Sequence, residues 1–125
     1  MAKINLFGEI NAWKESIDFN KVIYDLTIKG EFEKYFDLKR QIRRASVSIS
    51  SNIAEGFERN TNREFIHFLY ISKASAGEVG SQLYLALDLG HLEEKQFILL
   101  KEKIENISIM LSGFIKNWIS RQGTL

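Results

Sequence analysis

The chain has 125 residues, of which 45% are hydrophobic and 26% charged; this is typical of one globular domain and argues against a disordered or fibrous protein. It contains no cysteine, which excludes a disulfide framework, a thiolate zinc site and a cysteine nucleophile. Its formal net charge of +1 gives no whole-molecule field that would attract nucleic acid or an anionic membrane.

Two helices are predicted in the first half of the chain, where the absence of proline allows long uninterrupted segments. The first covers residues 10–27. Its inward-facing candidates are Trp13, Ile17, Ile23 and Tyr24. After a longer connection over 28–36, the second helix covers residues 37–56, with Asp37 as its N-cap and Gly56 as its stop. Its apolar stripe consists of Leu38, Ile42, Ala45, Ile49 and Ile53.

Two further helices are predicted in the second half. The third covers residues 62–88 and opens with a capping box, in which Thr61 and Glu64 satisfy each other's backbone N–H groups. The fourth covers residues 93–120, where apolar residues recur in alternating steps of three and four. These residues are Phe97, Leu100, Ile104, Ile107, Leu111, Phe114 and Trp118.

The connections at 57–61 and 89–92 are short, which makes the last three helices antiparallel neighbours. The sequence therefore predicts an all-α protein, an antiparallel up-down-up-down four-helix bundle forming a single domain over residues 1–125. There is no apolar run of about 18 residues and no signal-peptide pattern, so we expect a cytoplasmic protein with no membrane partner.

The third predicted helix carries more apolar surface than one core needs. Between residues 68 and 87 the only charged residues are Lys73 and Glu78, and two glycines, Gly77 and Gly80, lie in mid-helix. Its apolar residues away from the core stripe are Ile71 and Leu85, and the fourth predicted helix has a similar set in Ile109, Met110, Ile115 and Ile119. Surface of this kind favours a homo-oligomer; the alternative is a wide core contact in a monomer.

A basic cluster lies on the second helix, opposite its apolar stripe. Four residues of this cluster, joined by Arg59 beyond the far end of the helix, are candidates for binding phosphate groups of RNA or DNA. They are Lys39, Arg40, Arg43 and Arg44. Because no aromatic residue is interleaved among them to stack on bases, a solvated helix face is the alternative.

A polar stripe continues from the basic cluster along the same helix. Arg44, Ser48, Ser51 and Glu55 follow one another at steps of four, three and four. Helix-interior serines are unfavourable unless they are hydrogen-bonded, so the stripe indicates either a hydrated surface or a polar seam against another helix, inside the bundle or between subunits. Further candidates for this seam are Asn52 and Glu78.

Catalysis has little support in the sequence. The only metal-like pattern is Glu64-x-x-His67, half of the paired arrangement that di-iron bundles use, and a surface histidine explains it better. A metal-dependent enzyme using these two residues is the weakest hypothesis. We predict no catalytic residue, no metal ligand and no cofactor.

The second helix also resembles a known family. Residues 41–49 (QIRRASVSI) and 51–59 (SNIAEGFER) look like the signature of the four-helix bundle family of 23S rRNA intervening-sequence proteins. The similarity covers nearly the whole chain. It extends upstream to Trp13, Ile23, Tyr24 and Thr27, and downstream to Phe68, Leu69, Glu78, Gln82, Leu83 and residues 89–92 (LGHL).

The resemblance implies a bundle fold and an oligomer, most often a pentamer. A related family supplies the accessory protein of diversity-generating retroelements, which binds nucleic acid, so the resemblance also implies RNA or DNA as a partner. Our hypothesis is a non-enzymatic homo-oligomer that binds nucleic acid through the basic cluster. The rival hypothesis is an oligomeric protein–protein scaffold with no nucleic-acid role.

Overall fold

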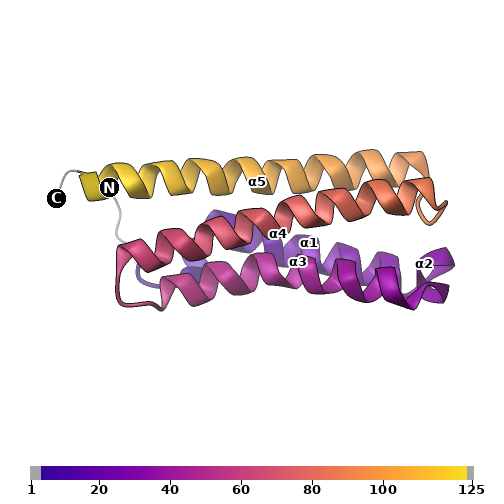
Figure 1. The fold of residues 1–125 in the computed structure, drawn as a ribbon, viewed down its shortest axis with the longest axis horizontal. Coiled ribbons are helices and arrows are strands. Elements are labelled where there is room, and N and C mark those ends of the chain that lie inside the picture. Colours follow the sequence, from indigo (N-terminus) through magenta and orange to yellow (C-terminus); the bar gives the residue numbers. More distant parts are fainter. Residues whose placement is uncertain (1–3, 124–125) are drawn as a thin grey trace.

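The computed structural model describes residues 4–123 of the chain, with side chains for residues 4–120 (Figure 1). Long antiparallel helices make up nearly all of this part, and it contains no strand. The elements are the 3₁₀ turn η1 (Phe7–Glu9) and the helices α1 (Asn11–Thr27), α2 (Gly30–Lys34), α3 (Phe36–Phe57), α4 (Asn62–Asp88) and α5 (Glu94–Gly123). The predicted all-α bundle is confirmed. Within residues 4–123, no helix combines the length and the hydropathy needed to cross a membrane.

The short helix α2 is the one element that the sequence pattern does not predict. It lies within the connection 28–36, where Gly30 adopts a positive φ of 67° that reverses the chain after α1. Phe32 then turns inward and is only 1% exposed, so one buried ring anchors the segment to the bundle. Five residues are too few for a helical period to be visible in the sequence.

Three details of the predicted helix ends are wrong, and the one at Gly56 is described with the α3–α4 contact below. Asp37 is not the N-cap of α3: Tyr35 occupies that position without a side-chain hydrogen bond, and Asp37 lies in the first turn, where its carboxylate favours the helix dipole. In the capping box, Thr61 Oγ1 accepts from the Glu64 backbone N–H at 3.1 Å. The Glu64 carboxylate, however, accepts from the Thr61 hydroxyl at 3.4 Å, not from the Thr61 backbone N–H as predicted.

The predicted apolar stripes form the core. Fully buried positions come from every long helix and include Ile23, Ile42, Ile49, Ile53, Leu69, Leu83 and Leu111. Two of the inward-facing candidates of α1 are exceptions: Tyr24 is 42% exposed, and Ile17 is half-buried and lies outside the core cluster. Two residues that the sequence placed outside the core stripes also differ from expectation. Ile115 is 3% exposed and belongs to the core, and Met110 is half-buried.

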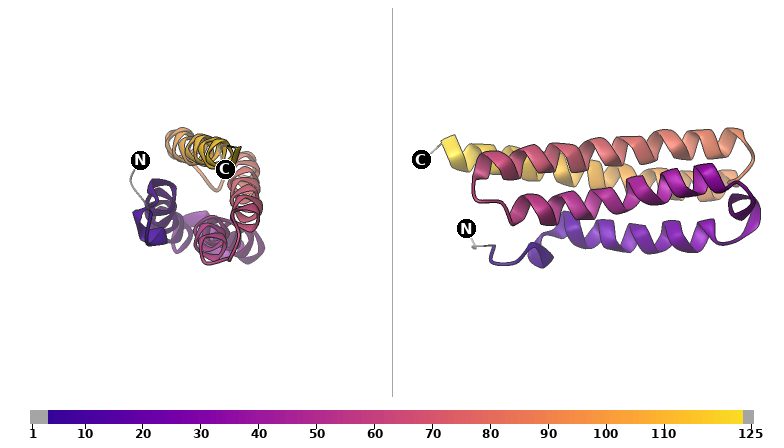
Figure 2. Two further views of the ribbon diagram at one scale, coloured as in Figure 1. Left: turned by 90° about the vertical axis from the view of Figure 1, so that its left-hand side faces the viewer. Right: turned by 60° about the horizontal axis from the view of Figure 1, so that its bottom comes forward.

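The helices form a curved row in the order α1, α3, α4, α5, seen end-on in Figure 2. The contacts of α3 with α4, of α4 with α5 and of α3 with α1 are extensive, whereas α1 touches α5 only slightly. The two interior helices, α3 and α4, therefore make most of the contacts of the bundle.

Near the α3–α4 turn the two helices come very close together. Gly56 is buried one residue before the end of α3, and it is not the helix stop. A Cβ atom added to it would lie 2.5 Å from Phe68 Cβ and 3.1 Å from the Phe65 ring. Only glycine allows this approach.

Gly56→Ala is expected to lower the free energy of unfolding by about 1–3 kcal/mol, because the added methyl group forces α3 and α4 apart. Gly80→Ala is the matched control, since nothing lies within 4 Å of its added Cβ; it should raise the free energy of unfolding by about 1 kcal/mol. Urea denaturation followed by circular dichroism measures both changes. Equal effects of the two substitutions would contradict the close contact at Gly56.

Candidate functional site

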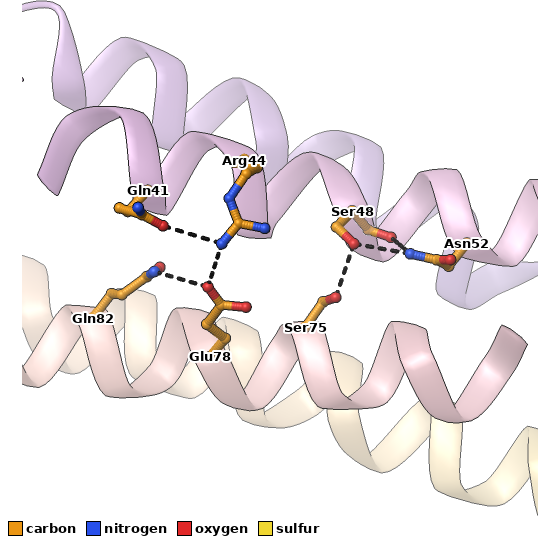
Figure 3. Close-up of polar contacts among 7 residues, drawn as sticks. All are labelled: Gln41, Arg44, Ser48, Asn52, Ser75, Glu78 and Gln82. Carbon is orange, nitrogen blue, oxygen red and sulfur yellow. Dashed lines mark hydrogen bonds and ion pairs between the residues drawn. The ribbon is translucent and has the colours of Figure 1, made fainter. Parts of the chain in front are cut away.

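The structure divides the predicted basic cluster, and Arg44 is engaged within the chain. Its Nη2 lies 2.7 Å from Glu78 Oε2 of α4 and 3.0 Å from Gln41 Oε1 (Figure 3). Glu78 also accepts from Gln82 Nε2 at 3.3 Å. The positive charge of Arg44 is therefore partly neutralised by the neighbouring helix, although both side chains remain exposed.

Arg43 faces α1 instead of open solvent. Its Nε donates to Thr27 Oγ1 at 2.8 Å, and its guanidinium lies 4.3 Å from the centroid of the Tyr24 ring. Its Nη2 is buried and has no hydrogen-bond partner among the described residues. Arg43 therefore contributes to the α1–α3 contact, and its side chain does not face open solvent as the sequence suggested.

Arg40 is the member of the cluster most available to a ligand. It is exposed, and its guanidinium lies 5.5 Å from the centroid of the Phe36 ring, which is 60% exposed. Lys39 is half-buried beside it. A polar hollow of about 380 Å³ adjoins Arg40 and is also lined by Asp37, Gln41 and Arg44.

Arg40, Arg43, Phe36 and Tyr24 form what we call the arginine–aromatic face, in which each guanidinium lies over a ring. Sequence reasoning missed these rings, because Tyr24 comes from another helix and Phe36 was assigned to a connection. Proteins that bind single-stranded nucleic acids combine cations, which contact the backbone, with exposed rings, on which the bases stack.

Arg59 is not part of this face. It lies just beyond the other end of α3, about 25 Å along the helix axis from Arg40. Its Nη2 is 3.0 Å from Glu55 Oε1, and its guanidinium lies 4.8 Å from the centroid of the Phe68 ring. One chain therefore does not bring Arg59 together with the rest of the predicted cluster.

Only part of the predicted polar stripe, Arg44 and Ser48, contacts α4 (Figure 3). Ser48 Oγ is 2.9 Å from Ser75 Oγ, and Asn52 Nδ2 donates to both the backbone oxygen and the hydroxyl of Ser48 at 2.8 Å. Ser51 is exposed on the outer side of α3, and Glu55 is exposed and pairs with Arg59. The seam within this chain therefore consists of Arg44, Ser48, Asn52, Ser75 and Glu78.

A second polar seam joins α3 to α1 and was not predicted. Ser46 donates its hydroxyl hydrogen to Asn20 Oδ1 at 2.5 Å, and Asn20 Nδ2 donates to Ser50 Oγ at 3.1 Å. Ser46 is fully buried. The signal in the sequence was the i, i+4 spacing of the two serines, which places both on the α1 side of the helix.

The two histidines are not brought together. Glu64 is engaged at the start of α4, and His67 is exposed with its ring against the edge of Phe68. His91 stacks on the Tyr35 ring at 4.3 Å, and both its ring nitrogens are buried without a hydrogen-bond partner in the described part of the chain. Across that part, no three His, Asp or Glu side chains gather closely enough to hold a metal ion.

The outward side of α4 is exposed and uncharged over about four turns. We call it the α4 outer face, and it consists of Tyr70, Ala74, Gly77, Ser81 and Leu85. Tyr70 and Leu85 are 53% and 48% exposed, and a Cβ added to Gly77 would meet nothing within 4 Å. Ile71, which the sequence placed with this surplus surface, is half-buried.

Two comparisons with known proteins gave a match, one to a family and one to a solved structure. Residues 8–113 match the family model described as 23S rRNA-intervening sequence protein. A crystal structure of a protein of unknown function from the S23 ribosomal protein family of Bacteroides thetaiotaomicron has the same fold, with a TM-score of 0.79. The two chains are 24% identical, and the superposition covers 84% of this chain and 95% of the other. The comparison with curated proteins gave no match.

Two polar contacts of α3, Ser46 with Asn20 and Arg44 with Glu78, should contribute differently to the free energy of unfolding. Asn20→Ala is expected to lower the free energy of unfolding by about 1–3 kcal/mol, because the buried Ser46 hydroxyl loses its acceptor. Glu78→Ala, which removes the exposed ion pair with Arg44, should change it by less than about 1 kcal/mol. Denaturant titration of both variants tests this order, and the reverse order would contradict it.

Proposed function

The chain belongs to the 23S rRNA-intervening sequence protein family, and from this membership and its surfaces we propose that it is a non-enzymatic, self-assembling bundle whose copies together bind RNA or DNA. Assembly is the primary part of this proposal. The observation that carries it is the α4 outer face, an exposed helix surface without a charged side chain.

The glycine in the α4 outer face strengthens the case for assembly. Mid-helix glycine costs about 1 kcal/mol relative to alanine, and nothing within the chain approaches Gly77 closely enough to require it. A helix of a second copy packed across Gly77 and Ala74 would explain why a glycine is present, because small residues allow two helices to approach closely. Tyr70 and Leu85 at the ends of the face provide the apolar area that such a contact buries. The family resemblance suggests five copies.

Nucleic-acid binding is the second part, and the arginine–aromatic face favours it. Arg44 is paired with Glu78 and Arg43 is turned toward Thr27 and Tyr24, so Arg40 and the half-buried Lys39 are the members of the cluster left to contact phosphate. One chain therefore neutralises few phosphates and binds weakly. Several copies in one assembly repeat the face and raise the effective concentration for a strand that reaches more than one of them. Exposed Phe36 favours unpaired bases, which can stack on it, over a duplex.

The surroundings of Glu64 and His67, the two residues of the metal-like pattern, support the non-enzymatic part of the proposal. Glu64 holds the start of α4 through Thr61, and His67 packs its ring on Phe68. Both side chains thus have local structural partners.

Light scattering on the purified protein is expected to give a mass of several 14.5-kDa subunits. Ala74→Glu should reduce this mass toward one subunit, because a carboxylate at the centre of the α4 outer face cannot be buried unpaired. Ser51→Glu, which adds the same charge to the exposed side of α3, is the matched control and should leave the mass unchanged. A wild-type monomer at micromolar concentration would refute assembly.

Fluorescence anisotropy with a mixed-sequence single-stranded RNA should show binding in the range of about 10⁻⁶–10⁻⁴ M that weakens steeply with salt. Arg40→Glu and Phe36→Ala should each weaken it several-fold, because they remove a cation and a stacking surface. Lys95→Glu, on an exposed lysine of α5, is the control for net charge. Lack of binding at low salt, or equal effects of Arg40→Glu and Lys95→Glu, would leave assembly as the only function supported.

A further inference from the structure

The edge of the bundle between α1 and α5 is incompletely closed. These helices stand at the two ends of the curved row in Figure 2, and their mutual contact is slight. Two hollows of about 160 and about 400 Å³ follow one another along this edge. We call the edge the α1–α5 seam.

Apolar side chains line both hollows of the seam, together with polar ones. Phe19 and Ile107, each 2% exposed, line the smaller hollow. The half-buried Met110 and Phe114 line the larger one. A Cβ added to Gly113, also in the larger hollow, would meet nothing within 4 Å. The seam therefore offers its apolar surface mainly through half-buried side chains, Val22 in the smaller hollow and Met110 and Phe114 in the larger one, with open space beside Gly113.

The rim of the seam carries more negative than positive charge. Its charged lining residues are Glu9, Glu15 and Asp18 on the side of α1 and Lys103 on α5. Within the described residues, neither Glu15 nor Lys103 is in an ion pair, and Asp18 has only Lys21 at 4.0 Å, where both side chains are more than 70% exposed. An occupant with positive charges along the α1 side complements this rim.

From this geometry we propose that the α1–α5 seam binds an amphipathic, basic helix of another protein. Its apolar side chains enter the two hollows, and its lysines or arginines lie against Glu15 and Asp18. The α5 lining runs from Lys103 to Asn117, about 21 Å at 1.5 Å per residue, which matches a helix of about four turns. Apolar residues at i, i+3 or i+4, and i+7 of the occupant follow the two hollows. This site is separate from both the α4 outer face and the arginine–aromatic face.

Two synthetic peptides test the proposal. Both have sixteen residues of leucine and alanine in an amphipathic helical pattern, one with lysine and the other with glutamate at its polar positions. Fluorescence anisotropy with labelled peptide and the full-length protein at physiological salt should show micromolar binding of the lysine peptide. The glutamate peptide should bind at least tenfold more weakly.

Two variants locate the site. The double variant Glu15→Lys with Asp18→Lys should weaken binding of the lysine peptide at least tenfold. The double variant Glu102→Lys with Glu105→Lys is its matched control, because it reverses two exposed carboxylates at the same spacing outside the hollows. Gly113→Leu fills the larger hollow without changing any charge, and it should weaken binding while circular dichroism stays unchanged.

Three results would overturn the proposal. The first is equal binding of the lysine and glutamate peptides to the wild type. The second is equal loss of binding in the two charge-reversal variants, which would indicate attraction by net charge alone. The third is that Gly113→Leu lowers the oligomer mass in light scattering and leaves peptide affinity unchanged, because a second copy of the chain would then occupy the seam.

Discussion

Hydrogen bonds between small polar side chains on both flanks of α3 are the constraint on which the bundle depends. On one flank Ser46 bonds to Asn20 of α1, and on the other Ser48 meets Ser75 of α4. Ser72 of α4 adds a third bond, donating to the backbone oxygen of Ile49 at 2.7 Å. Because a buried hydroxyl without a partner costs about 1–3 kcal/mol, sliding either neighbouring helix along α3 is unfavourable. Apolar packing alone tolerates such shifts more easily, so the hydroxyls select the register.

The sequence predicted the fold well because helix formation and burial both leave a periodic trace. The stripes of α3, α4 and α5 and the short turns between these helices were enough to specify the bundle. The short helix α2 left no period, and its anchoring by Phe32 is a tertiary effect. At the candidate site, the sequence placed four basic residues on one helix but could not assign their partners. Whether Arg43 meets Tyr24 and Arg44 meets Glu78 depends on which helices flank α3.

The pattern of one helix does not show which helices flank it, and this also explains why some residues expected on the outer apolar surface were wrongly assigned. Periodicity showed that α4 and α5 have more apolar residues than one stripe needs, but not which of them another helix covers. Ile115 proved to be core, whereas Ile109 is 67% exposed. The three surfaces considered for interaction lie on different parts of the row of helices: the outward side of α4, the outer side of α3 with α1, and the α1–α5 edge. Contact through one of them therefore leaves the other two accessible.

The slight contact between α1 and α5 also has a consequence for how the chain folds. Almost all extensive packing is between helices that follow one another closely in the sequence, so formation of the native contacts requires little long-range loop closure. Such a topology has a low contact order, which is associated with folding in microseconds to milliseconds. With no proline in the chain, slow prolyl isomerisation does not delay it. If copies of the chain assemble as proposed, each one should thus be folded before it meets another, and a slow, concentration-dependent phase in refolding would report their encounter.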